Sequence, residues 1–201
     1  MKKSEVLIMP RREFIASASF LALGGQLFGT SPFLSQSTPA PQELKKELTP
    51  EELKIVGKSI MAKDLENYFA KGFSCAESLL MMSLKFLGQP EELVWIASGF
   101  GGGLYHKDLC GFLTSGVMAI GLSSGMLKKE RKEGQEHCRQ KLDQYWEWWS
   151  STAPIHCSEI RKEDTGSKED PEYKICRRIG QLAAVKIEEL IKPAKAATFA
   201  S

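Results

Sequence analysis

The feature that most constrains the fold is a series of helix-start signals with no strand pattern between them. Residues 49–52 and 74–77 are capping boxes, in which a Thr or Ser precedes a Glu by three positions. They predict helices that end near Lys71 and Leu87. Because no segment alternates apolar and polar residues over a useful length, we expect an all-α protein.

Further helices are expected in the rest of the chain. Pro90 opens a short one that Gly99 closes, and Asp108 is the expected N-cap of one that runs to about Leu122. The helix after Asp108 is rich in Gly, Ser and Ala, so another backbone can approach it closely. We therefore expect it to be the buried centre of a compact bundle of about five to six helices. The other helical segments are expected at residues 128–149, near residues 155–161, and from Asp170 to about residue 192.

Residues 1–42 are expected to be a signal peptide and linker outside the fold. A basic start precedes a modestly apolar stretch, residues 14–28, which is short for a bilayer span and is interrupted by Gly and Ser. The pair Arg11-Arg12 resembles a twin-arginine signal, which implies export after folding. We expect a periplasmic or other extracytoplasmic location, with membrane contact only through this segment if it stays uncleaved. A Sec signal and an uncleaved anchor are the alternatives.

One domain, residues 43–192, is expected to follow, with a frayed tail at residues 193–201. The formal net charge is +2, and charged residues make up 26% of the chain, as in ordinary soluble proteins. No basic block interleaved with aromatic residues is present, which argues against nucleic-acid binding.

The chain has five cysteines, an odd number, so at least one thiol has no disulfide partner within the chain. Cys138 shares an apolar helical stripe with Leu142 and Tyr145, and we interpret it as a structural core residue. The other four lie at or near expected helix starts, where unpaired N–H groups stabilise a thiolate and lower its pKa. These four candidates for a redox or metal site are Cys75, Cys110, Cys157 and Cys176.

A run of glycines precedes the second of these four cysteines. Gly99, Gly101, Gly102, Gly103 and Gly111 give a stretch in which few side chains can block the backbone. Backbone N–H groups can therefore gather around a thiolate, a cluster sulfide or an anion, and we expect this segment to contribute donors to a cofactor. A phosphate loop is disfavoured because no Gly-Lys-Ser/Thr ending follows. A flexible turn between helices is the alternative interpretation.

The segments FSCAESLL, ASGFGGGLYHKDLCGFLTSGVMAIGL, IHCSEI and YKICRRIG resemble the family of redox-active proteins that is named for a C_GCAxxG_C_C signature. The resemblance covers residues 68–190 and gives the four signature positions to Cys75, Cys110, Cys157 and Cys176. The helix after the second cysteine departs from the signature, because Gly116 lies one residue later than the glycine of the signature does. The family is also similar to the cysteine domain of split-Soret cytochromes, which implies a two-iron cluster and a homodimer.

The resemblance favours an exported electron carrier that holds a [2Fe–2S] cluster on these four cysteines and has a redox protein as its partner. A metal-free thiol–disulfide redox protein is the first alternative, although no C-x-x-C pair is present. The second is a helical binding module held by zinc or disulfides, with Trp148, which lies off the apolar stripe, on its partner surface. Electron transfer is expected rather than hydrolase or transferase activity.

Overall fold

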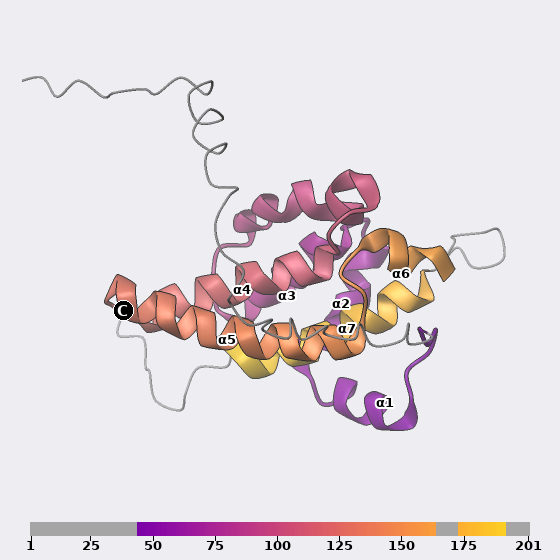
Figure 1. The fold of residues 1–201 in the computed structure, drawn as a ribbon, viewed down its shortest axis with the longest axis horizontal. Coiled ribbons are helices and arrows are strands. Elements are labelled where there is room, and N and C mark those ends of the chain that lie inside the picture. The colour runs from indigo at the N-terminus through magenta and orange to yellow at the C-terminus, as the bar shows by residue number, and fades with distance from the viewer. Residues whose placement is uncertain (1–43, 164–172, 192–201) are drawn as a thin grey trace, which may run out of the picture. The chain divides into compact units, whose positions relative to one another are not determined.

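Helices follow one another through the part of the chain that a computed structural model describes, residues 44–163 and 173–191 (Figure 1). The α-helices are α1 (Pro50–Val56), α2 (Ile60–Ala70), α3 (Cys75–Phe86), α4 (Gly111–Leu127), α5 (Arg131–Thr152), α6 (Cys157–Glu163) and α7 (Lys174–Ile191). A 3₁₀ helix, η2 (Glu91–Phe100), and a short π-type segment, η3 (Gly103–Lys107), connect α3 to α4. The expected all-α fold is confirmed, and no strand occurs among the described residues. The seven α-helices and the 3₁₀ helix exceed the expected five to six.

The small-residue helix α4 is at the centre of this arrangement, as the sequence predicts. It packs against α3, α5, α7 and η2 (Figure 1). Gly116 shows why small residues are needed there, because a Cβ at this position would lie 2.5 Å from ring atoms of Tyr145 in α5. Small residues therefore let the core helices approach closely. The outward side of α4 has no charged residue, and Val117 and Gly121 are exposed on it.

Both predicted capping boxes are present. The Glu52 N–H donates to Thr49 Oγ1 at 3.3 Å and the Thr49 N–H donates to Glu52 Oε2 at 2.9 Å. Ser74 and Glu77 exchange the same pair of bonds at 3.3 and 2.8 Å. Each box satisfies two N–H groups that the helix itself leaves unpaired. The second box fixes Cys75 as the first residue of α3.

The single helix expected from the first capping box to Lys71 is divided in two. Helix α1 ends at Val56, and α2 starts at Ile60 with Ser59 as its N-cap. The Ser59 hydroxyl accepts from the Ala62 N–H at 3.0 Å and donates to Glu188 Oε2 at 2.6 Å. Glu188 lies in α7, so a contact across 129 residues supports the break. Sequence reasoning missed it because the partner of Ser59 is remote.

The expected N-cap of the central helix is also wrong. Helix α4 is capped by Cys110, whereas Asp108 lies two residues earlier and pairs its carboxylate with His156 at 2.8 Å. The helix runs five residues beyond the predicted end at Leu122. The helix expected to open at Pro90 is a 3₁₀ helix, and the expected cap at Asp170 lies outside the described residues. None of the helices in the described part of the chain is long and apolar enough to cross a membrane.

Candidate functional site

An isolated β-bridge places two of the predicted site cysteines side by side. Leu109 pairs with His156, the Cys110 N–H donates to the Ile155 carbonyl at 2.9 Å, and the Cys157 N–H donates to the Asp108 carbonyl at 2.6 Å. Successive side chains of extended backbone point to opposite faces. Leu109 and His156 are exposed, and both cysteines are buried. The bridge therefore turns Cys110 and Cys157 inward together.

A glycine brings the third cysteine to the same place. Gly111 is the first residue of α4, and a Cβ there would overlap the Sγ of Cys75. The same Cβ would lie 3.0 Å from the Ala76 nitrogen and 3.0 Å from the Phe100 carbonyl oxygen. The start of α4 therefore lies directly against the start of α3. Only glycine gives the Cys75 sulfur its position next to residues 110 and 111.

A second glycine makes room for Cys157. A Cβ on Gly103 would lie 2.7 Å from Cys157 Cβ and 2.6 Å from the Asp108 nitrogen. Gly103 also has φ of +68°, which a side chain disfavours. The glycine-rich segment and the β-bridge together gather Cys75, Cys110 and Cys157. The three residues come from the start of α3, the cap of α4 and the start of α6.

Burial has the largest effect on the pKa of the Cys75 thiol. It raises the pKa of Cys75, while the N–H group of Gly102 lowers it and the neighbouring Cys157 raises it again. The N–H groups of Ala76 and Gly111 also favour the Cys75 thiolate. Amides of the glycine-rich segment and of two helix starts therefore face this sulfur, as in a backbone nest for an anion.

Cys75, Cys110 and Cys157 together form what we call the cysteine centre. Cys110 has the most strongly raised pKa of the three. Burial raises its pKa to about 12, and the nearby Cys75 adds to this increase. The side chain makes no regular capping hydrogen bond, but the N–H groups of Leu113 and Phe112 favour its thiolate. Like charges on adjacent sulfurs would repel one another in a site with little water. The centre as it stands therefore holds protonated thiols at neutral pH.

Cys157 lies at the basic edge of the centre. Burial raises the pKa of Cys157, and Arg161, four residues later in α6, opposes the increase through its charge and a side-chain hydrogen bond. The charge of Lys107 acts in the same direction. Arg161 also stacks on the Tyr173 ring, with its guanidinium 4.6 Å from the ring centroid. Positive charge is thus concentrated at one of the three thiols.

The expected lowering of the cysteine pKa values is wrong for these three residues. The cysteines do lie at helix starts, as predicted, but the loss of hydration on burial outweighs the stabilisation by backbone N–H groups. Only the tertiary structure shows how deeply each thiol is buried. Helix position alone was therefore an incomplete guide to thiolate chemistry.

The fourth candidate is placed differently. Cys176 is the third residue of α7, half-buried and packed against the hydrophobic core, whereas the glycine and β-bridge contacts described above are those of the other three cysteines. Cys138 is half-buried on the core side of α5. Gly101 packs on Ser74, with its Cβ position 2.8 Å from Ser74 Cβ, whereas the Cβ position of Gly99 is open. Of the glycines expected at the site, Gly102 and Gly111 lie next to Cys75, and Gly103 lies next to Cys157.

Three side chains that the sequence did not single out for roles at the site lie around it. The Asp108–His156 pair ties the outer face of the β-bridge, and Arg161 faces Cys157. Asp108 was expected only as a helix cap. No local pattern joins residues 48 positions apart, so only the fold could reveal this pair.

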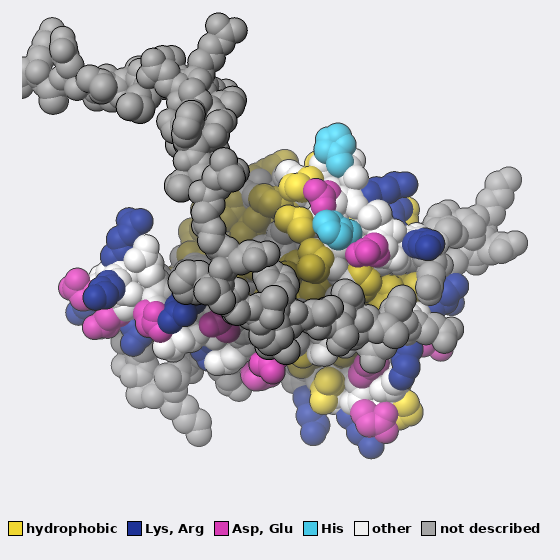
Figure 2. Space-filling model, viewed as in Figure 1, with side chains coloured by type: hydrophobic (Ala, Val, Ile, Leu, Met, Phe, Trp, Pro, Cys, Tyr) yellow, Lys and Arg dark blue, Asp and Glu magenta, His cyan; other side chains and the backbone are white. Residues whose placement is uncertain are grey.

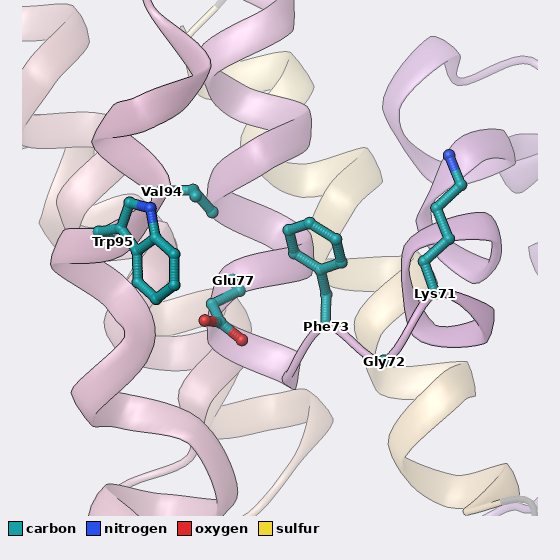
Figure 3. Close-up of a pocket in the computed structure, with 6 residues that line it drawn as sticks. All are labelled: Lys71, Gly72, Phe73, Glu77, Val94 and Trp95. Atoms are coloured by element: carbon teal, nitrogen blue, oxygen red, sulfur yellow. The ribbon is translucent and has the colours of Figure 1, made fainter.

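A cleft of about 280 Å³ lies beside the cap that positions Cys75 (Figure 3). Phe73 and Trp95 border it from two sides, and Glu77 lies between them (Figure 3). Glu77 Oε1 accepts from the Ser98 hydroxyl at 2.6 Å, and Oε2 accepts from the Ser74 N–H. The carboxylate in the cleft is therefore already engaged in tying η2 to the start of α3.

The same geometry decides whether these residues, as placed, can hold a metal ion. Across residues 44–163 and 173–191, no three or more His, Cys, Asp or Glu side chains lie close enough together to hold a metal ion as placed. The donor chemistry nevertheless suits a soft metal centre, because thiols, shielding from water and inward N–H groups occur together. Figure 2 shows histidine and acidic side chains among hydrophobic ones on the viewed face of the helical unit.

Comparison with known proteins identifies one protein family. A family model described as "Putative redox-active protein (C_GCAxxG_C_C)" matches residues 73–190. No curated protein and no solved structure matches the chain. The matched range is more than half of the chain and contains all three gathered cysteines together with Cys176.

Proposed function

Because the chain belongs to the C_GCAxxG_C_C family of redox-active proteins, we propose that it is an exported electron carrier whose centre is built on cysteine sulfur. The observation that carries this proposal is the gathering of Cys75, Cys110 and Cys157, which Gly103 and Gly111 make sterically possible. Protonated thiols are readily buried as small hydrophobic groups, but three of them gathered beside several inward backbone N–H groups form an arrangement suited to sulfur chemistry. A redox centre uses all of these features.

We propose a [2Fe–2S] cluster as the cofactor, with Cys75, Cys110 and Cys157 as three ligands. The family signature assigns the fourth position to Cys176. When bound, such a cluster supplies one-electron transfer. The protein's own contribution is to exclude water and to direct the N–H groups of Gly102 and Gly111 at Cys75. A metal cation would also offset the mutual repulsion of the thiolates.

Metal analysis of protein purified without oxygen tests this proposal. We expect brown protein that contains iron and acid-labile sulfide, and we expect Cys110→Ser to lose both. Cys138→Ser is the matched control and should keep both, because Cys138 lies outside the gathered cysteines. Colourless protein with stoichiometric zinc would contradict the cluster and indicate a structural metal site.

A thiol–disulfide protein is the second candidate, favoured by the absence of a metal-holding group among the described residues. Two thiols of the centre would form one disulfide, and their two electrons and two protons would reduce the disulfide of a partner protein. Metal-free protein that titrates reversibly with two electrons would support this chemistry. Cys157 would be the thiol whose thiolate a neighbouring cation favours, because Arg161 acts on it through its charge and a side-chain hydrogen bond.

Export by the twin-arginine route is part of the proposed function and rests on the sequence of residues 11–14. Folding and cofactor insertion would then precede transport. Replacing Arg11 and Arg12 by Lys keeps the charge but removes the motif. We expect this variant to accumulate in the cytoplasm, as measured by cell fractionation, whereas replacing Lys2 and Lys3 by Arg should leave export intact. Unchanged export of the first variant would contradict this route.

A further inference from the structure

We propose that the cleft between Phe73 and Trp95 is a docking site for a partner protein, and that it takes up one arginine side chain of that partner. The cleft lies beside the cap formed by Ser74 and Glu77, which positions Cys75. A partner seated there would therefore lie close to the start of α3. The inference requires no cofactor at the cysteine centre, so it is tested independently of the function proposed above.

The 3₁₀ geometry of η2 directs one row of side chains toward the cleft. Residues three positions apart lie over one another in a 3₁₀ helix, so Glu92, Trp95 and Ser98 share one face of η2. The Ser98 hydroxyl donates to Glu77 Oε1 at 2.6 Å, which fixes this face of η2 to the start of α3. The row therefore presents an acidic group and an indole ring beside the cleft.

The two aromatic rings of the cleft are available to a ligand. Trp95 is 75% exposed, whereas Trp149 in the core is fully buried. Phe73 is half-buried and borders the cleft on the side opposite Trp95 (Figure 3). Tryptophan contributes strongly to binding when a partner covers it, because its large ring loses contact with water. An indole ring held in solvent at the edge of a cleft is therefore suited to a protein interface.

The Glu77 carboxylate supplies negative charge between the two rings (Figure 3). Oε1 accepts from the Ser98 hydroxyl, and Oε2 accepts from the Ser74 N–H at 2.8 Å. A carboxylate has about four acceptor positions, so Glu77 can accept further hydrogen bonds from a ligand. Glu77 is half-buried and so keeps contact with the cleft. The internal bonds also orient the carboxylate before a ligand arrives, which lowers the entropy cost of binding.

The lysines near the cleft direct their charge elsewhere. The Lys71 ammonium lies 5.2 Å from the centroid of the Tyr68 ring, and the side chain points away from Glu77 in Figure 3. Lys85 lies over the same ring and pairs with Glu91 at 3.4 Å. A ligand that enters between the two aromatic rings therefore meets negative charge and π faces, both of which favour a cation.

Size and chemistry together select an arginine side chain as this cation. The cleft has a volume of about 280 Å³. Pockets for free small molecules usually measure about 300–1,000 Å³ and bury most of the ligand, so this cleft suits a single side chain better. A guanidinium plane can stack on an indole ring while its N–H groups donate to a carboxylate. A lysine ammonium is more strongly hydrated and does not stack.

Saturation-transfer NMR on the full chain as purified tests the docking site, with the peptide acetyl-Gly-Gly-Arg-Gly-Gly-amide as the probe. We expect saturable transfer to the arginine side chain with a Kd of roughly 1–10 mM, as for one isolated contact. The peptide with citrulline in place of arginine has nearly the same shape without the charge. It should bind roughly tenfold more weakly, and the lysine peptide should lie between the two.

Variants of the chain locate the binding. Trp95→Leu should weaken binding of the arginine peptide by roughly fivefold or more. Trp146→Leu is the matched control, because Trp146 is 51% exposed on α5 and does not line the cleft, so binding should be unchanged. Glu92→Gln leaves the cap at Ser74 intact and should weaken binding by roughly twofold, as expected for an exposed charge.

Three results would overturn the docking site. They are equal binding of the arginine and citrulline peptides, unchanged binding by Trp95→Leu, and equal losses in Trp95→Leu and Trp146→Leu. Agmatine, a free guanidinium compound, distinguishes the source of the ligand and should bind no more tightly than the peptide. Agmatine binding tenfold tighter would indicate a small-molecule site and overturn a protein partner. Iron is measured in the same samples, so a failure of the docking site and a failure of the proposed cofactor are separate results.

Discussion

At the scale of single residues, Cys110 shows how burial competes with a helix N-terminus for control of a thiol. Its sulfur lies at the cap of α4, where the N–H groups of Leu113 and Phe112 favour the thiolate. Burial and the nearby Cys75 nevertheless raise the pKa of Cys110 to about 12. The folded, metal-free protein therefore prefers the protonated thiol.

This preference predicts a loss of stability at high pH. An unfolded Cys110 ionises near its ordinary pKa of about 9, while the folded residue stays protonated up to about 12. The stabilising contribution is therefore complete below about pH 9 and declines as pH rises from about 9 toward 12, by at most about 1.4 kcal/mol per pH unit. Urea unfolding of reduced, metal-free protein at pH 7.5, 9 and 10 measures the decline.

A variant at the same residue supplies the control for this pH dependence. Cys110→Ala removes one of three thiols whose pKa is raised and should make the fall in the free energy of unfolding less steep, whereas Cys138→Ala should leave its slope unchanged. A parent protein whose stability is constant from pH 7.5 to 10 would contradict the inferred burial of the thiol.

Gly111 and Gly121 give a matched pair within α4. The Cβ of Gly111→Ala would displace the Cys75 sulfur and crowd the backbone of Ala76, so we expect a loss of about 1–3 kcal/mol and of the cofactor. The Cβ of Gly121→Ala meets nothing within 4 Å and should stabilise the helix by about 0.5–1 kcal/mol. Thermal unfolding and iron content measure both effects, and a Gly111→Ala protein that keeps its iron would refute the close contact.

At the scale of structural elements, the segment before α4 is a strained left-handed turn. Gly102, Gly103, Leu104 and Tyr105 all have φ between +56° and +68°, and Lys107 has φ of +59°. Each non-glycine residue in this region costs about 1–2 kcal/mol. The strain occurs where the chain passes over Cys75 and Cys157, as expected for a segment that a functional site dictates.

Lys107→Gly is expected to relieve part of this strain. The gain from a residue that tolerates positive φ exceeds the added flexibility of the unfolded chain, leaving a net stabilisation of about 0.5–1 kcal/mol. Lys129→Gly is the control, because Lys129 is exposed and does not have positive φ. Denaturant unfolding of both variants tests the difference, and a destabilised Lys107→Gly protein would show that the turn is not strained.

At the scale of the whole molecule, the centre is the place where separate elements are joined. Cys75 begins α3, Cys110 caps α4 and Cys157 begins α6. The β-bridge between Leu109 and His156 joins the segment before α4 to the segment before the short helix α6. A cofactor bound to all three would stabilise the folded state by mass action, because the unfolded chain does not present them together.

Loaded protein should therefore melt roughly 5–10 °C above the reduced, metal-free form. Hydrogen exchange should show the largest gain in protection in α6 and η3, since both depend on contacts at Cys157. Helix α2, which packs mainly on α7 and α3 and carries none of the three cysteines, serves as the internal control. Equal melting temperatures would mean that the three sulfurs do not share a ligand.

Much of the fold could be predicted from local patterns because a helix cap is a local interaction. The boxes at Thr49 and Ser74 formed as expected, and the small residues of α4 predicted its central place. The break at Ser59 and the pairing of Asp108 with His156 could not be predicted, because each depends on a residue far away in the chain.

The sequence by itself determined the helical class, the cap that precedes Cys75, the placement of cysteines near helix starts, and the family to which the chain belongs. The tertiary structure decided which thiols meet, since Cys75, Cys110 and Cys157 come together only when Gly103 and Gly111 are packed against them. It also decided the sign of their pKa shifts. The stabilising N–H groups follow from local helix geometry, but the burial that outweighs them arises only when distant helices pack together.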